Sequence, residues 1–531
     1  GQPEGRTAEA LADLARLEIV GDEHPVAFVH ALVRDAVYHS LPAAERGLWH
    51  ERAAAALWAA HESDEQVAAH LLLAPARGDE DVVALLRAAA RAALDRGSSE
   101  SAVTYLRRAL TEPPAGTCRP ELLVELGQLE ATLDGVAGVE HLVEAYHLHE
   151  DPRARAEIAI AAAATQIFAS PPGVATAFAR EAEAALPDEL TDELSDQRQS
   201  LIALQRVSGF MHSLEAGWRT PAPEPEGPGP GAQMLAATIA LEEALDGADR
   251  ERAVDMARFA LEGDRLLTVD DGLFWINAAA VKTLADDDLG SFWDRARAVG
   301  RSRGSLFTML SISLWEGFWR WRRGELHEAL ACLRDGLEQD RMWGGTGVGE
   351  PFALGFQILC HLDRGDVAAA RRSADSISGG PLVGESGRVF QQALAQLLVV
   401  EGRGEEALVV VAETPVGIAI TNPAWNPWRS ITAAALHGLG RTAEAVEVAE
   451  EEVALLRRWG APSYLGKGLY LLAQLRGSDG LDELRESVRL LESSPAAVDC
   501  ARARCTLGNR PEVPDEEASR LLLRAFRPSR Q

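Results

Sequence analysis

The chain has 531 residues, 47% hydrophobic and 25% charged, so it is long enough to bury several packed units of a globular protein. Its formal charge of −29 predicts repulsion from a phosphate backbone, and we expect no nucleic-acid binding by this chain alone. No apolar run reaches the roughly 18 residues that a membrane span needs, so we expect no membrane association.

The first patterned stretch is FVHALVRDAVYHSLPAAERGLWHERAA, residues 28–54, a helical sequence rich in histidine. Histidines stand at positions 30, 39, 50, 61 and 70, at steps of nine to eleven residues. A two-histidine zinc motif needs its ligands on adjacent turns, so we expect no metal here and predict packed histidines. His30 and Tyr38 share a helical face with Val33 and Val37, so we expect both to pack inward.

A glycine followed five residues later by an alanine recurs along the chain. The pairs are Gly97 with Ala102, Gly324 with Ala329, Gly365 with Ala370, Gly402 with Ala407 and Gly440 with Ala445, and a version one residue longer is Gly247 with Ala253. The last four glycines are 41, 37 and 38 residues apart, a period typical of helix-hairpin repeats. Each glycine is interpreted as a left-handed residue where the chain reverses, and each alanine as a point of close helix approach.

These patterns predict an all-α fold, an α-solenoid of TPR-like helical hairpins. We place N-terminal repeats at residues 61–219, C-terminal repeats at 233–510, and a truncated last helix with a tail at 511–531. Between the two repeat blocks lies TPAPEPEGPGPGA, residues 220–232. It is expected to be a non-helical loop or hinge, because proline removes backbone donors and glycine adds backbone entropy.

The sequence LWEGFWRWRRGE, residues 314–325, is the richest candidate for a ligand or partner surface. Trp315 and Trp319 share a helical face and could stack against a small ligand or a peptide, with Arg322 beside them. The alternative is that these tryptophans form the core of a repeat. Trp425 and Trp428 present the same choice.

No motif for catalysis or for cofactor binding is present in the sequence. HExxH, GxSxG and CxxC are absent, and the glycine-rich connectors lack the Lys-Ser/Thr pair of a phosphate loop. The acidic runs at residues 286–288 and 450–452 are typical of a loop and of a solvated helix face. We therefore expect no catalytic residue, no cofactor and no metal ligand in this chain, which predicts that it is not an enzyme.

The five cysteines are scattered and odd in number, which favours a reducing compartment, the cytoplasm, over a disulfide framework. Cys500 and Cys505 lie five residues apart in a helical pattern without a nearby histidine pair. We interpret them as small core residues rather than zinc ligands.

Both ends of the chain resemble large ATP-binding regulators of the LuxR family. AEALADLARLEIV, residues 8–20, followed by FVHALVRDAVYHSLPAAERGLWHERAAAAL, residues 28–57, resembles the winged-helix end of their ATPase module. NPAWNPWRSITAAALHGLGRTAEAVEVAEEEVALLRRWGAPSYLGKGL, residues 422–469, and LRESVRLLESSPA, residues 484–496, resemble their late helical repeats.

The resemblance implies that residues 1–60 are a winged-helix remnant, the seam where a STAND-type switch ATPase passes into a sensor solenoid. It implies structural roles at this seam for His30, Arg34, Asp35, Tyr38 and His50. Family members carry a phosphate loop upstream and a DNA-binding helix-turn-helix downstream, and neither is present in these residues. Binding of ATP, magnesium and DNA would therefore belong to a longer bacterial parent protein.

Two hypotheses of function follow. In the first, the chain is the sensor and coupling region of an ATP-dependent transcription regulator, whose solenoid recognises an unknown inducer and relieves a closed state of the ATPase domain. In the second, it is a free-standing TPR-like scaffold for protein–protein interactions. A start codon and a phosphate loop upstream in the reading frame would decide for the first.

Overall fold

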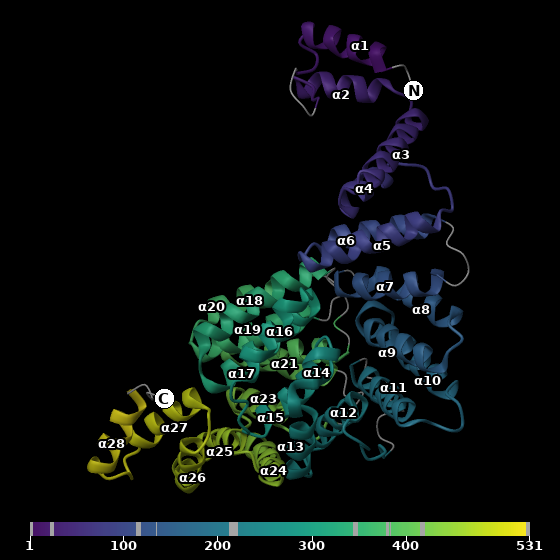
Figure 1. Ribbon diagram of the computed structural model, residues 1–531. Helices are drawn as coiled ribbons and strands as arrows, with labels where there is room; N and C mark the ends of the chain where they lie inside the picture. The colour runs from purple at the N-terminus through teal and green to yellow at the C-terminus, as the bar shows by residue number, and fades with distance from the viewer. Residues whose placement is uncertain are drawn as a thin grey trace. The chain divides into compact units, whose positions relative to one another are not determined.

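The computed structural model describes residues 4–21, 26–112, 118–133, 135–211, 221–343, 349–378, 382, 384–414 and 420–526 (Figure 1). These residues form helices joined by turns, with one isolated antiparallel bridge between Val20 and Phe28. The all-α class expected from the sequence is confirmed. None of the helices in these ranges combines the length and the hydropathy needed to cross a membrane.

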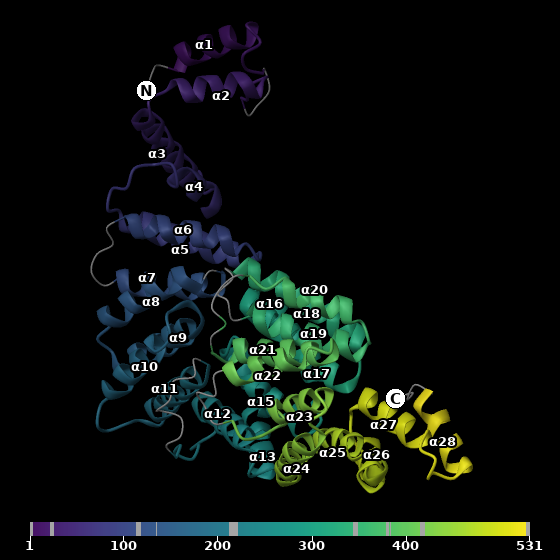
Figure 2. The same cartoon turned by 180° about the vertical axis from the view of Figure 1, so that it is seen from behind.

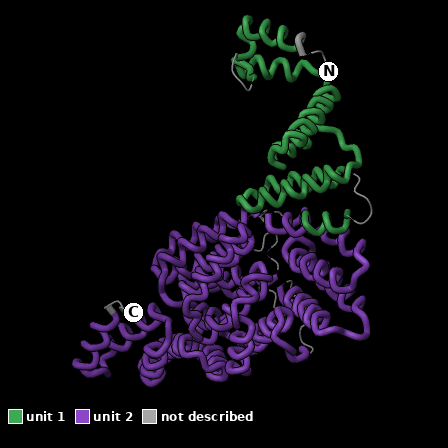
Figure 3. The backbone as a smooth tube through the Cα atoms, viewed as in Figure 1, with its two compact units in different colours: residues 1–126 green, residues 127–531 purple. Residues whose placement is uncertain are grey.

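The chain forms two compact units, residues 1–126 and residues 127–531 (Figure 3). The helices of the first unit are α1 (Glu4–Arg16), α2 (Ala31–Ser40), α3 (Ala43–Ala59), α4 (Asp64–Leu71), α5 (Glu80–Asp95), α6 (Ser99–Thr111) and the first part of α7 (Cys118–Leu133). Helices α5 and α6 form the hairpin that the first Gly-Ala pair predicts. Gly97 has φ +77°, and Ala102 is fully buried against the partner helix.

The N-terminal seam packs differently from the sequence expectation. Helix α2 buries none of its residues, His30 is exposed, and Val37 is 45% exposed. The expectation that this face of α2 packs inward is therefore wrong, because no described neighbour covers its apolar side chains. Arg34 and Asp35 pair with each other at 2.9 Å on the exposed surface. No structural comparison tests the winged-helix resemblance, which stays a prediction.

The rings of Tyr38, His50 and His70 connect the helices of the N-terminal seam through hydrogen bonds. The Tyr38 hydroxyl lies 2.9 Å from Nε2 of His50, and Nδ1 of His50 lies 2.9 Å from Nδ1 of His70. This chain of hydrogen bonds connects α2, α3 and α4. The two histidine nitrogens can share a proton only if one ring donates and the other accepts, so at least one of the two rings must be neutral. The described residues contain no group of three potential metal ligands.

The second unit is also built of helices. Its first helices are α8 (Gly135–Leu148), α9 (Pro152–Ala169), α10 (Val174–Ala184), α11 (Asp192–Met211), α12 (Pro230–Asp246), α13 (Arg250–Ala260), α14 (Arg265–Val269), α15 (Phe274–Leu284) and α16 (Phe292–Arg303). Side-chain caps fix several helix starts: the carboxylates of Asp151 and Asp249 each accept from a backbone N–H in the first turn, at 2.9 Å.

The later helices of this unit form the array that lines the site described below. They are α17 (Leu306–Arg323), α18 (Leu326–Trp343), α19 (Gly349–Asp363), α20 (Val367–Asp375), α21 (Gly384–Val400), α22 (Gly404–Glu413), α23 (Trp428–Gly438), α24 (Thr442–Trp459), α25 (Pro462–Arg476), α26 (Leu481–Glu492), α27 (Ala497–Gly508) and α28 (Asp515–Phe526). Each odd-numbered helix pairs with the even-numbered helix that follows it, and the odd-numbered helices also contact one another in order. This pattern is that of a solenoid of helical hairpins, as the sequence predicted.

The recurring glycine–alanine pairs have the predicted conformation and burial in these helices. Gly324, Gly365, Gly402 and Gly440 have φ between +76° and +84°, the left-handed region where glycine avoids the Cβ clash. Ala329, Ala370, Ala407 and Ala445 are fully buried. The outlying pair obeys the same rule, since Gly247 has φ +69° and Ala253 is fully buried.

The non-helical part of the proline- and glycine-rich segment at residues 220–232 is shorter than expected. Helix α12 begins at Pro230, because proline is tolerated in the first turn, where its missing N–H costs no helical bond. Residues 221–229 are non-helical as predicted, while Thr220 lies outside the described residues. The loop is anchored rather than free: Glu226 exchanges two backbone hydrogen bonds with the Gln199 amide, and the Pro228 carbonyl accepts from Arg265.

Hydrogen bonds between residues far apart in the chain join the late helices of the second unit to its early helices. The Trp459 indole N–H donates to the Leu284 carbonyl at 2.8 Å across 175 residues, and the ring is 1% exposed. The Asn422 amide donates to the Ala244 carbonyl at 2.6 Å, and the Ser463 backbone N–H donates to Asp286 at 2.7 Å. Both views of the ribbon show α13 and α15 beside α24 and α25 (Figures 1 and 2).

Protonation of His50 is expected to loosen the α2–α4 cluster. Burial lowers the pKa of His50 below 6.5, and the charges of His70 and Arg46 lower it further. The unfolded chain therefore takes up this proton first, so the contribution to stability is present above pH 6.5 and is lost as pH falls through the folded pKa. The variant His70→Gln should raise the pKa of His50 in an NMR titration of the ring; an unchanged midpoint would contradict the coupling.

Removing the Trp459 hydrogen bond should loosen the closure of the second unit. In Trp459→Phe the Leu284 carbonyl stays buried without its donor, which costs about 1–3 kcal/mol. Hydrogen exchange should quicken in α15 and α24 while α5 and α6 of the first unit stay unchanged. The exposed Trp58 gives the matched control, Trp58→Phe, which should leave α15 and α24 as they are. Equal protection in both variants would show that this contact does not hold the two segments together.

Candidate ligand-binding chamber

Helix α17 does not present its candidate residues on one ligand wall. Trp315 lies against Trp425 with ring centroids 6.0 Å apart and the planes nearly parallel. Trp319 packs against Trp293 and beneath the guanidinium groups of Arg320 and Arg323. Arg322 lies over the rings of Trp321 and Tyr464, away from Trp315 and Trp319. Side chains at i and i+4 share a helix face, but different neighbouring helices cover Trp315 and Trp319.

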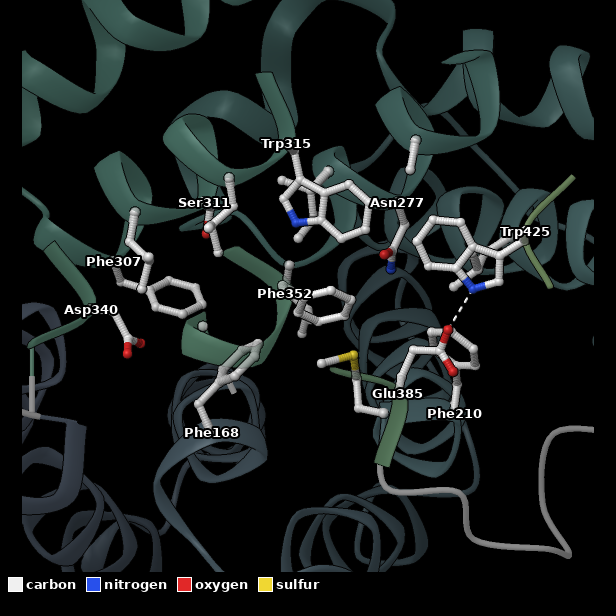
Figure 4. Close-up of a pocket in the computed structure, with 18 of the residues that line it drawn as sticks. Phe168, Phe210, Asn277, Phe307, Ser311, Trp315, Asp340, Phe352, Glu385 and Trp425 are labelled. Carbon is white, nitrogen blue, oxygen red and sulfur yellow. Dashed lines mark hydrogen bonds between the residues drawn. The ribbon is translucent and has the colours of Figure 1, made fainter. Parts of the chain in front are cut away.

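Trp315 belongs to an apolar cavity surrounded by aromatic rings (Figure 4). Phe168 and Phe307 meet on one side with centroids 4.7 Å apart, and Trp425 closes another side, where its indole N–H donates to Glu385. The free volume is about 50 Å³, room for a few water molecules and not for an organic ligand. This packing favours the interpretation of Trp315 and Trp425 as core of the solenoid.

Three buried polar atoms face this aromatic cavity without a hydrogen-bond partner among the described residues: Nδ2 of Asn277, Oδ1 of Asp340 and Nε1 of Trp343. Burial raises the pKa of Asp340 to about 6. Such atoms are usually satisfied by ordered water, and the small volume fits that role.

A larger cavity lies beyond the aromatic wall, and we call it the arginine chamber. Its volume is about 420 Å³, within the range of small-molecule sites. The odd-numbered helices α17, α19, α21, α23, α25 and α27 all contribute to its lining, together with Trp425 and two residues of α24. The inner row of helices in the solenoid therefore surrounds it. Trp425 separates it from the aromatic cavity, because this ring lines both.

Arg322 is a charged group of the chamber that makes no ion pair with a described residue. The side chain is 9% exposed, and its Cζ lies 4.4 Å from the ring centroid of Tyr464 and 5.1 Å from that of Trp321. Neither Nε nor Nη2 has an acceptor among the described residues, and the guanidinium forms no ion pair with them. A guanidinium stays protonated in proteins, so a full positive charge is held here between two aromatic faces.

Arg502 and Asp363 form the paired part of the chamber wall. Arg502 donates to the Asp363 carboxylate at 2.7 Å and to its backbone carbonyl at 2.8 Å, and the Trp321 indole N–H donates to the same carboxylate at 2.7 Å. Burial raises the pKa of Asp363, but Lys467 and Arg502 lower it more, so the pKa lies below its ordinary value and the carboxylate is ionised. Lys467 itself lines the chamber without an ion pair within the described residues.

Glu452 corrects an expectation from the sequence. The run at residues 450–452 was expected on a solvated helix face, yet Glu452 is 3% exposed and lines the chamber. It accepts from the Ser430 backbone N–H at 2.6 Å and from the Ser430 hydroxyl. Burial raises its pKa to about 7 against these hydrogen bonds, which lower it. The orientation of α24 therefore places Glu452 on the buried face of the helix, and an acidic run in the sequence does not show which of its residues lies on that face.

The other residues that the sequence singled out lie away from the chamber. Cys500 packs in the apolar core of the last hairpins, and all five cysteines are free. The chamber residues that sequence reasoning missed are Asp363, Glu452, Tyr464, Lys467 and Arg502. One signal for Lys467 was available, since it is one of only two lysines in the chain.

Comparisons with known proteins bear on the fold alone. No family model matches the chain, and no curated protein matches its sequence. Among solved structures, the APC/C hetero-tetramer Cut9-Hcn1 is similar over 83% of this chain and 96% of that chain, at 12% identity and a TM-score of 0.40. The structure of yeast Tom70 is similar over 84% and 92%, at 12% identity and a TM-score of 0.29.

Replacing Glu452 should change how stability depends on pH. Its pKa is raised from 4.5 to about 7, so its contribution to stability is fully present below pH 4.5 and is lost as pH rises through 7. Glu452→Gln keeps an acceptor for Ser430 and removes the buried charge, so it should stabilise the second unit at pH 8, by on the order of 3 kcal/mol relative to its effect at pH 4. Thermal unfolding at the two pH values measures this, with exposed Glu447→Gln as control; parallel curves for both variants would contradict it.

Proposed function

We propose that this chain is the sensor and coupling region of an ATP-dependent transcription regulator similar to the LuxR-type regulators, and that the arginine chamber receives its inducer. The chain is a TPR-like helical-repeat solenoid without a recognised catalytic motif. A helical-repeat solenoid presents its inner helices to a ligand or partner, and here those helices line a cavity of small-molecule size. The resemblance of residues 8–57 and 422–496 supplies the regulatory context.

The observation that carries this proposal is the buried guanidinium of Arg322 beside empty volume. Its Nε and Nη2 are buried without an acceptor among the described residues, and a buried donor without an acceptor is costly, so an acceptor that enters the chamber would stabilise it. A repeat that served only as packing could place an apolar residue at this position at no such cost. The chamber is therefore better explained as a binding site than as an accident of helix packing.

The position of the chamber suits a sensor. Its lining joins α17 and α19 to α25 and α27, and Arg502 of α27 already bonds Asp363 of α19 across 139 residues. A ligand here contacts repeats that are distant in the chain. Binding would therefore stabilise one relative placement of those repeats over others, which is the thermodynamic requirement for passing a signal. In the cytoplasm, where the free cysteines would persist, that signal would reach the ATPase and DNA-binding domains of a longer chain.

Native mass spectrometry after incubation with a bacterial metabolite extract tests ligand reception. Ala434 lines the chamber, so Ala434→Phe should fill part of it and abolish a small-molecule adduct seen with the unmodified chain. Ala412 lies exposed on α22, and Ala412→Phe should retain the adduct. An adduct that survives in Ala434→Phe, or an extract that yields none with the unmodified chain, would contradict a sensor role for the chamber.

The regulatory context has a separate test. The reading frame of the gene should continue into a phosphate-binding loop on one side and a helix-turn-helix on the other. A frame that encodes neither would favour the scaffold hypothesis and leave the chamber to be explained by a different ligand role.

A further inference from the structure

We propose that the arginine chamber selects a small organic anion with a flat apolar body, an aryl carboxylate or a molecule of that chemistry. This inference rests on the proposed role of the chamber as a ligand site, and adds the chemical class of the ligand. Three features of the chamber support it: the unmet hydrogen-bonding capacity of Arg322 among the described residues, the cations in the lining, and the aromatic character of the walls.

No carboxylate of the described residues forms an ion pair with Arg322. Three carboxylates act on it electrostatically, those of Asp286, Asp363 and Asp499, and none is within ion-pairing distance among the described residues. Asp286 accepts from the Ser463 backbone and hydroxyl at 2.7 and 2.6 Å, and Asp363 is held by Arg502 at 2.7 Å. Asp499 lies 4.0 Å from Arg502. Each acid is thus committed elsewhere, and the guanidinium donors remain open to an acceptor from outside.

Cations outnumber carboxyl groups in the lining of the chamber, although two further carboxylates, Asp286 and Asp499, act on Arg322 from outside that lining. Arg322, Lys467 and Arg502 contribute three cations to its lining, against the carboxyl groups of Asp363 and Glu452. Asp363 offsets Arg502, and Glu452 is engaged by Ser430 through two hydrogen bonds. Because burial raises the pKa of Glu452 to about 7, this carboxyl carries only part of a charge at neutral pH. Lys467 also lowers the pKa of Asp363, but neither Arg322 nor Lys467 makes an ion pair with a described residue. Both can therefore bind an anion directly, although the chain as a whole has a charge of −29.

Aromatic rings supply the other half of the recognition. Phe318, Trp321, Phe356 and Trp425 line the chamber, and Trp321 and Phe356 are stacked with centroids 6.3 Å apart and planes at 28°. Phe318 lies 5.0 Å from Phe356. Aliphatic side chains of α19 and α21 complete this wall. A flat apolar body can stack here while its carboxylate reaches the guanidinium, an arrangement in which planar Arg and planar carboxylate match in shape.

Other ligand classes satisfy less of the site. A neutral apolar molecule would leave the Arg322 donors unpaired in a still drier environment, and an organic cation would be repelled by the nearby charges of Arg322 and Lys467. Inorganic phosphate would satisfy the charge but leave most of the 420 Å³ and its aromatic wall unused. The combination of both features selects an amphipathic anion.

The test compares 2-naphthoate with 2-naphthamide, which has the same ring and no charge, by calorimetric titration of the full chain. We expect the carboxylate to bind roughly tenfold or more tightly than the amide, because charge-assisted hydrogen bonds are the stronger ones. Arg322→Met should remove this preference, and Lys467→Met should reduce it. Removing a buried unpaired charge in Arg322→Met should not impair folding, which circular dichroism and hydrogen exchange check. Exposed Arg301→Met should behave like the unmodified chain.

The outcomes separate the ligand class from the existence of the site. Equal binding of carboxylate and amide, unaffected by Arg322→Met, would overturn the anion assignment while leaving the chamber as a ligand site. Inorganic phosphate that binds as tightly as 2-naphthoate and competes with it would overturn the requirement for an apolar body. A chain that binds neither naphthalene probe, before and after Ala434→Phe, would overturn both this assignment and the chamber as the sensor site.

Discussion

The second unit depends on contacts that fasten its late repeats to its early ones. Trp459 is buried and donates to the last turn of α15, and Asn422 bonds the last turn of α12. Both acceptors are carbonyls at helix C-termini, where four carbonyls per helix lack intrahelical donors. The side chains that close the solenoid therefore also satisfy helix ends that would otherwise be buried without partners. A solenoid in which each hairpin touched only its neighbours would have no such requirement.

The chamber follows from this closure together with the hairpin period. The chain reverses at the left-handed glycines, so successive helices lie in turn in an inner and in an outer row. The inner row consists of the odd-numbered helices, which line the chamber. Because α27 returns to α19, where Arg502 meets Asp363, helices from distant repeats line one common cavity. Burial then changes the chemistry of that space, because it raises the pKa of Glu452 to about 7 and so reduces the negative charge of this carboxyl at neutral pH.

The sequence predicts the local rules of this fold and not its long-range contacts. Glycine at a helix end and alanine one turn into the next helix have steric causes within one hairpin, so Gly324 with Ala329 could be interpreted directly. Arg322 was a candidate because it lies in an aromatic run, but its unpaired state depends on Tyr464 and Asp363, which come from other repeats. Glu452 was misplaced because an acidic run does not show which member faces inward. At the N-terminal seam, helical periodicity predicted that Val37 packs inward, but no described neighbour covers its side chain.

The central claim is that Arg322, whose Nε and Nη2 are buried without an acceptor among the described residues, binds an anionic ligand. A crystal structure of the chain with 2-naphthoate tests it most directly. The carboxylate should lie within hydrogen-bond distance of the Arg322 guanidinium, with the naphthalene ring against Trp321, Phe356 or Trp425. A guanidinium that instead donates to Asp286, Asp363 or Asp499, with the probe bound elsewhere or absent, would contradict the account.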